Sequence, residues 1–196
     1  MKHIFYFLLA IVLLLFAYVV FRLIVRHDYT TRGRLSTLSS SLQLIVFIGF
    51  FSFPYQFNPP EWTWFWKVST SSSQGLHLAG LVLIGIGFMG AFGTMAWFGI
   101  KRAFGIYIDG LKKAGPYQVS RNPQILGGYL LVIGASLQWP SLYMIGWTLM
   151  YAIIAHWMVI TEEEHLLRIY GEEYEEYCSE VPRYLLARRK KSRASA

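Results

Sequence analysis

Two polar clusters in an otherwise apolar sequence contain the side chains that could bind or activate a small molecule. The first, Arg121-Asn122-Pro123, follows a Gly-Pro-Tyr turn and leads directly into an apolar run. The second, Glu162-Glu163-Glu164, follows the next apolar run. Arginine presents a planar fork of donors to a carboxylate or phosphate, whereas glutamate can pair with a cation or accept a proton. The two clusters therefore predict a site for a charged small molecule.

Asn122 and Pro123 also have a structural interpretation, because asparagine is favoured at a helix N-cap and proline at the first helical position. A helix start also has free N–H groups and a partial positive charge that attract an anion, and Arg121 lies beside it. Cap and anion site are compatible. Gly128, one turn inside, would permit close approach of either a neighbouring helix or a flat ligand.

The acidic run, Glu162-Glu163-Glu164, can be a solvated helix face, or one or two of its glutamates can face inward and bind the positive part of a ligand. Adjacent acids repel one another unless cations compensate them. His156 lies within the preceding apolar run, where an ionisable side chain is a functional candidate. A lone histidine that is hydrogen-bonded to another helix is nevertheless the favoured interpretation, and without a second histidine at ligand spacing we expect no metal site.

The composition assigns these clusters to a membrane protein. Of the 196 residues, 55% are hydrophobic and 15% charged, with a mean hydropathy of +0.39, far from the quarter charged that is typical of soluble domains. The single cysteine, Cys178, excludes an internal disulfide and a cysteine-based zinc site. We expect one integral-membrane domain, without a separate soluble one.

Hydropathy predicts an all-α polytopic membrane helix bundle with about five transmembrane helices and a cytoplasmic amphipathic C-terminal segment. The first span is expected to be retained, since no small-residue cleavage site follows it. The third, rich in glycine, is expected to be the central packing helix. The predicted spans are 4–25, 41–57, 75–100, 123–139 and 141–160.

Basic residues follow the first and third predicted spans and fill the C-terminal tail, so the N-terminus is predicted outside and the C-terminus in the cytoplasm. We expect a prokaryotic inner membrane rather than the endoplasmic reticulum. The tail from Arg188 to Arg193 is expected to contact anionic lipids, and neither nucleic acid nor an obligate protein partner is indicated. Aromatic residues from Trp62 to Trp66 are expected to anchor an outer loop at the headgroup level.

An amphipathic helix is predicted near the C-terminus. Aromatic and aliphatic residues there recur at intervals of three and four, with glutamates between them. The apolar face would lie on the bundle and the acidic face in water. The apolar positions are Tyr170, Tyr174, Tyr177 and Val181, and the acidic ones are Glu172, Glu173, Glu175 and Glu176.

The last 85 or so residues resemble the isoprenylcysteine carboxyl methyltransferase and phospholipid methyltransferase group of integral-membrane enzymes, which use S-adenosylmethionine. The likeness lies in the order of motifs around a hairpin of two spans. These are Gly115-Pro116-Tyr117, Arg121-Asn122-Pro123, Glu162-Glu163-Glu164, Tyr170-Gly171-Glu172-Glu173-Tyr174-Glu175-Glu176-Tyr177 and Val181-Pro182.

The resemblance implies that S-adenosylmethionine is bound near the arginine motif and the glutamate run. By motif it suggests Tyr117, Arg121, Asn122, Pro123, Gly128, Tyr129, His156, Glu163 and Glu164 as cofactor-binding candidates, with Glu163 and Arg121 in the catalytic roles. The sequence departs from the family pattern at Asn122, where histidine is usual, and at Met158, where arginine is. The implied substrate is lipophilic and membrane-embedded, an isoprenylcysteine carboxylate or a lipid headgroup. Tyrosine rings could stabilise a sulfonium by cation–π contact.

Two other functions remain open from the sequence. One is an NADPH-dependent membrane reductase, because steroid-reductase-like families resemble this architecture at the C-terminal end. The other is a non-catalytic membrane scaffold, for which Asn122 and Met158 are the motivation.

Overall fold

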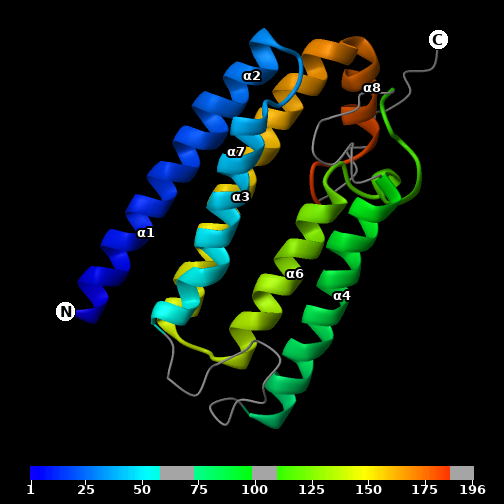
Figure 1. The fold of residues 1–196 in the computed structure, drawn as a ribbon. Helices are drawn as coiled ribbons and strands as arrows, with labels where there is room; N and C mark the ends of the chain where they lie inside the picture. Colours follow the sequence, from blue (N-terminus) through cyan, green and yellow to red (C-terminus); the bar gives the residue numbers. More distant parts are fainter. Residues whose placement is uncertain (58–72, 99–109, 186–196) are drawn as a thin grey trace.

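The computed structural model describes residues 1–57, 73–98 and 110–185, and every regular element in these ranges is helical (Figure 1). This confirms the predicted all-α class. The predicted aromatic loop anchor and basic tail lie outside the described residues. The elements are α1 Lys2–Tyr18, η1 Val19–Val25, α2 Arg26–Thr31, α3 Thr37–Ser52, η2 Phe53–Gln56, α4 Gln74–Phe98, η3 Gly115–Gln118, α6 Pro123–Gln138, α7 Leu142–Tyr170 and α8 Glu172–Glu180.

Four stretches among the described residues are long and apolar enough to cross a bilayer: Lys2–Thr31, Thr37–Gln56, Gln74–Trp97 and Leu142–Tyr170. The helix α6 has 16 residues and lies antiparallel beside α4 (Figure 1). The protein is thus an integral-membrane helix bundle. That α6 is a fifth crossing stays a prediction, because it is shorter than the other four.

The helices α1, α3 and α7 form one part of the bundle, and aromatic residues fill the space between them. Phe50 of α3 stacks on Trp147 of α7 with ring centroids 4.9 Å apart, and the Trp147 indole N–H donates to the Phe50 carbonyl at 2.9 Å. Tyr6 of α1 donates its hydroxyl to the Tyr143 carbonyl at 2.7 Å. These hydrogen bonds satisfy polar groups inside the bundle, where the hydrocarbon of the bilayer offers no hydrogen-bond partner.

A π-helix, η1, joins α1 and α2 without a break in the helix axis (Figure 1). It places Arg22 against α7, where Nη2 lies 2.9 Å from Glu164 Oε1 and Nη1 donates to Thr161 Oγ1 at 3.0 Å. Arg26, one turn later, donates Nε to Glu164 Oε2 at 2.7 Å. Glu164 therefore fastens the first span to α7.

The helix α4 lies at the edge of the bundle and packs mainly on α6 (Figure 1). The expectation of a central packing helix was therefore wrong. Two of its glycines lie on the face that contacts α6. A Cβ on Gly87 would lie 2.6 Å from the Gly127 carbonyl oxygen, and a Cβ on Gly80 would lie 2.7 Å from the Gly134 carbonyl oxygen. Gly85 faces open space. Two glycine pairs, seven residues apart on each helix, let the two backbones touch.

The helix α7 continues to Tyr170 with no interruption at the acidic run, although we expected this span to end near residue 160. The chain turns at Gly171, whose φ of 47° and ψ of −123° disfavour any other residue, and α8 follows. Tyr174 and Tyr177 of α8 are buried, while Glu172 and Glu173 are exposed. The predicted amphipathic helix is confirmed, separated from α7 by a glycine.

The Gly171→Ala variant is expected to lose about 1–3 kcal/mol of stability, because an L-residue is strained at this backbone conformation. No atom lies within 4 Å of an added Cβ, so the loss would come from the backbone alone. Gly75→Ala is the matched control, since its Cβ also meets open space and its φ is not positive. Denaturation of the purified variants in detergent measures both. Equal losses would contradict the backbone explanation.

Candidate active site

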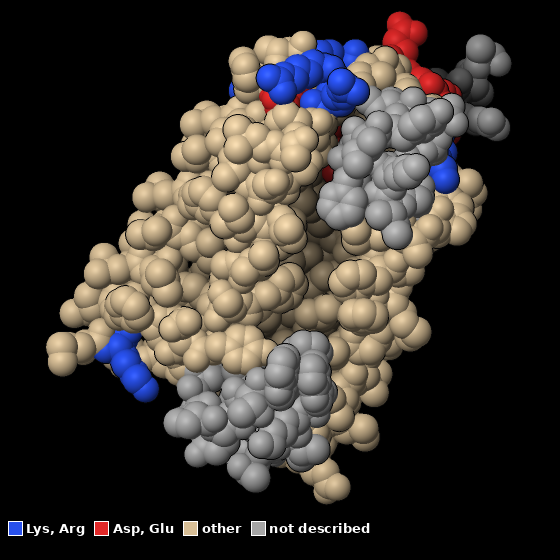
Figure 2. Space-filling view, viewed as in Figure 1, with Lys and Arg blue, Asp and Glu red and all other residues tan. Residues whose placement is uncertain are grey.

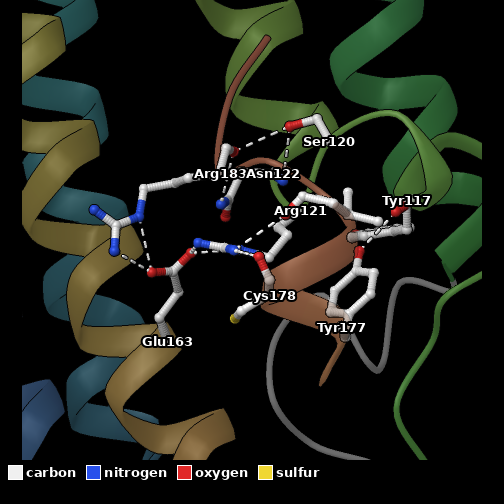
Figure 3. Close-up of polar contacts among 9 residues, drawn as sticks. Tyr117, Ser120, Arg121, Asn122, Glu163, Tyr177, Cys178 and Arg183 are labelled. Atoms are coloured by element: carbon white, nitrogen blue, oxygen red, sulfur yellow. Dashed lines mark hydrogen bonds and ion pairs between the residues drawn. The ribbon is translucent and has the colours of Figure 1, made fainter. Parts of the chain in front are cut away.

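Three charged side chains from distant parts of the sequence meet at the end of the bundle where α8 lies (Figure 3). Glu163 of α7 receives Arg121 Nε at 3.0 Å on Oε1 and Arg183 Nε at 2.8 Å on Oε2. Arg121 directly precedes the N-cap of α6, and Arg183 follows α8. Each carboxylate oxygen also has a second guanidinium nitrogen within 3.0 Å. One carboxylate is thereby held between two arginines.

The remaining donors of Arg121 are used inside the protein. Its Nη1 donates to the carbonyls of Cys178 and Val181, both at 3.1 Å. The Arg121 and Glu163 side chains are only 11% exposed. The Arg121 guanidinium, which we expected to attract an anion, thus holds the end of α8 in place. Arg121 and Glu163 are both buried, and each compensates the charge of the other.

Residues 181–184, here called the C-terminal strap, cross the start of α6. The Arg121 N–H donates to the Pro182 carbonyl at 3.0 Å, and Ser120 Oγ donates to the Arg183 carbonyl at 3.0 Å. Asn122 stands at the N-cap and Pro123 begins α6, as predicted, but the Asn122 side chain makes no capping bond. Its Nδ2 donates to the Arg183 carbonyl at 3.3 Å instead. Asn122 therefore binds the strap.

Tyrosines connect α8 to the turn before α6. Tyr177 donates its hydroxyl to the Tyr117 carbonyl at 2.6 Å, and Tyr117 donates to Gln124 Oε1 at 3.2 Å (Figure 3). Burial raises the pKa of Tyr177 to about 12, so this hydroxyl keeps its proton and remains a donor. The hydrogen bond from Arg183 to Glu163 raises the pKa of Arg183, which stays charged.

The three glutamates point in different directions, because successive helical residues are about 100° apart. Glu163 faces Arg121 and Arg183, and Glu164 faces Arg22 and Arg26 on the α1 side. Glu164 therefore lies apart from the site where we placed it by motif. Glu162 is partly exposed and has no hydrogen bond or ion pair with any described residue. Among the three glutamates, only Glu162 has no cationic partner within the described residues.

Comparison with known families identifies the chain. The family model for phospholipid methyltransferases matches residues 76–173, half of the 196 residues. The chain belongs to the phospholipid methyltransferase family. Searches of curated proteins and of solved structures found no match. The matched range holds α4, α6 and α7 with both polar clusters, and the general activity that it implies is methyl transfer.

The other residues suggested by motif lie in varied positions. A Cβ on Gly128 would meet the Tyr151 hydroxyl, so Gly128 accommodates a side chain of the protein itself. His156 is exposed on α7, two turns before Glu163 and outside the arginine network. Tyr129 is partly buried, and its ring meets Tyr151 edge to face.

The sequence reasoning missed Arg183 and Ser120. Arg183 follows Val181-Pro182 directly, so it adjoins a segment already noted in the phospholipid methyltransferase resemblance. The signal that could have found it is charge balance, since adjacent acids at a membrane boundary need cations from elsewhere in the chain. Ser120 gives no such signal, because its role depends on the path of the strap.

Proposed function

We propose that the protein transfers a methyl group from S-adenosylmethionine to a lipophilic acceptor that reaches the site from the bilayer. The family supports methyl transfer in general. The observation that carries the finer proposal is that the half-buried Glu162 has no hydrogen bond or ion pair with a described residue, whereas Glu163 beside it is paired with two arginines. A cationic ligand is what such a carboxylate would bind.

The described residues fit this cofactor at several points. Glu162 suits the ammonium group of the cofactor's methionine part, because the other two glutamates of the run, Glu163 and Glu164, are already paired with arginines. Tyr184 has a buried hydroxyl without a hydrogen-bond partner, which a ligand atom would satisfy. Glu163 then holds the strap that carries Tyr184 in place, instead of touching the cofactor.

Three tyrosines next to the strap offer ring faces to a cation. The rings of Tyr151 and Tyr184 are both nearly perpendicular to that of Tyr129, at 89° and 88°. Tyrosine faces stabilise cations that lie within about 6 Å of the ring centre. Bound S-adenosylmethionine would supply an activated methyl group on a sulfonium, so the residues need only align the reactants and exclude water.

The acceptor's apolar part has a place to lie beside the site. A groove of about 510 Å³ runs between α4 and the start of α6, and it ends at Ser120 and Pro123. Its other walls are almost wholly apolar, with Ile86, Met89 and Leu126 among them. We place this end of the bundle in the cytoplasm, where S-adenosylmethionine is available, and the N-terminus outside.

A titration of the purified full-length protein with S-adenosylhomocysteine tests the proposal. The parent protein is expected to bind, and Glu162→Gln to lower the affinity about tenfold or more, because a hydrogen bond to a charged group is worth about 1.5–3 kcal/mol. Glu172→Gln is the matched control, because this glutamate is exposed on α8 and has no ion pair with a described residue.

No binding by the parent protein would overturn the cofactor assignment. Stabilisation by NADPH but not by S-adenosylhomocysteine would favour the reductase instead. Equal affinities for the Glu162 and Glu172 variants would remove Glu162 from the site while leaving the cofactor in place.

A further inference from the structure

A second groove, separate from the arginine network, lies between the end of the first span and the start of α3. Its volume is about 760 Å³. The part nearer the membrane is apolar, and the part nearer the end of the molecule is polar. The apolar walls are Leu23, Ile24 and Leu38, and the polar ones include His27, Arg32 and Thr37.

The polar part of the groove, together with the adjoining turn at residues 32–34, has an excess of positive charge. Arg32 is 63% exposed, and its Nε lies 3.7 Å from Asp28 Oδ1, too far for a hydrogen bond. Arg34 is exposed and has no ion pair within the described residues. Figure 2 shows basic side chains gathered at the same end of the molecule. These cations can therefore bind an external anion.

The one acid in the groove is already satisfied. Asp28 is buried, and its Oδ2 accepts the Ser36 N–H at 2.8 Å and the Ser39 hydroxyl at 2.5 Å. These two hydrogen bonds hold Oδ2 of the carboxylate against the start of α3. Asp28 pairs with Arg32 at 3.7 Å through its other oxygen and makes no ion pair with Arg34, so the two exposed arginines outnumber the one acid.

The start of α3 adds donors to the same wall. Ser36 is the N-cap, and its Oγ accepts the Ser39 N–H at 3.2 Å. The N–H groups of Thr37 and Leu38, the first two helical residues, have no acceptor within the helix. Thr37 and Leu38 are both exposed and line the groove. The helix contributes a partial positive charge at this point.

We propose that this groove binds an anionic phospholipid from the leaflet at this end of the bundle. The phosphate lies between Arg32 and the free N–H groups of Thr37 and Leu38, and an acyl chain lies along Leu23 and Ile24. A soluble phosphate would leave the apolar walls uncovered, and an apolar ligand would leave the exposed guanidinium and helix N–H donors without an acceptor. Only an amphipathic anion matches both halves of the groove.

Titration of the full-length protein in detergent with dioleoylphosphatidylglycerol tests this site, with retained lipid measured by native mass spectrometry. Arg32→Gln is expected to weaken binding about fivefold, which corresponds to about 1 kcal/mol per basic residue near anionic lipid. Thr37→Pro is expected to weaken it further, because it removes one N–H donor. Proline is tolerated at the first helical position, and Ser36 has the extended conformation that precedes proline.

The control is Lys2→Gln, a basic residue at the start of α1, the far end of the first span. It is expected to bind the lipid as the parent does. Equal weakening in Lys2→Gln, equal binding of dioleoylphosphatidylcholine, or unchanged binding in both Arg32→Gln and Thr37→Pro would each overturn the site. Competition by inorganic phosphate as effective as by the lipid would also overturn it.

Discussion

The Glu163→Ala variant is expected to lose about 3–5 kcal/mol of stability and to detach the C-terminal strap. Removal of the carboxylate leaves Arg121, 11% exposed, with no counterion. Breaking one partner of a buried pair is costly because the other charge stays buried and uncompensated. Arg183 is more exposed and contributes less. Denaturation of the purified protein in detergent micelles measures the loss.

Glu164→Ala is the matched control for this prediction, because the neighbouring glutamate also pairs with two arginines. Its side chain is 32% exposed and Arg26 is 52% exposed, so water screens the interaction and the expected loss is about 1 kcal/mol. An apolar double variant, Arg121→Met with Glu163→Leu, is expected to regain much of the stability. Equal losses for the two alanine variants would contradict the proposed burial effect.

The Gly127→Val variant is expected to separate α4 from α6 and to lower stability by about 3 kcal/mol or more, at the upper end for overpacked cores. An added Cβ would lie 2.3 Å from the Ala91 nitrogen and 2.8 Å from the Gly87 carbonyl oxygen. Both are backbone atoms, which cannot rotate away as a side chain can. Since Arg121 lies just before α6, affinity for S-adenosylhomocysteine should fall with stability.

Gly85→Ala on α4 separates this effect from a general effect of substitution in the helix. No atom lies within 4 Å of a Cβ at that position, and alanine favours helix more than glycine does. We expect unchanged or slightly higher stability, measured by the same denaturation. Destabilisation of similar size in both variants would show that helix propensity, rather than the α4–α6 contact, is responsible.

Much of the fold was predictable because hydropathy and helix-start signals are local. The class, the start of α6 at Pro123 and the apolar face of α8 all follow from composition and spacing. The position of α4 was not predictable, since glycines on two faces of a helix do not reveal which face has a neighbour. The extension of α7 to Tyr170 was missed because charged residues continue a helix as readily as they end a span.

The site was predictable in part. The motif correctly brought Arg121 and Glu163 to the same place, although they are 42 residues apart in the chain. It did not reveal that Glu163 pairs with two arginines while Glu162 pairs with none in the described residues. That difference arises from helix rotation and from Arg183, whose approach depends on the turn at Gly171. Long-range pairing of charges cannot be read from local spacing.

The path of the C-terminal strap sets an order of events during synthesis. Within the part of the chain that the structure describes, the four helices long and apolar enough to cross a bilayer lie in residues 1–170, before the strap. The partners of Ser120, Asn122 and the Arg121 N–H are carbonyls at Pro182 and Arg183. A chain that has just inserted therefore has its spans but no completed site. The proposed ligand site is therefore complete only once residues 181–184 have left the ribosome.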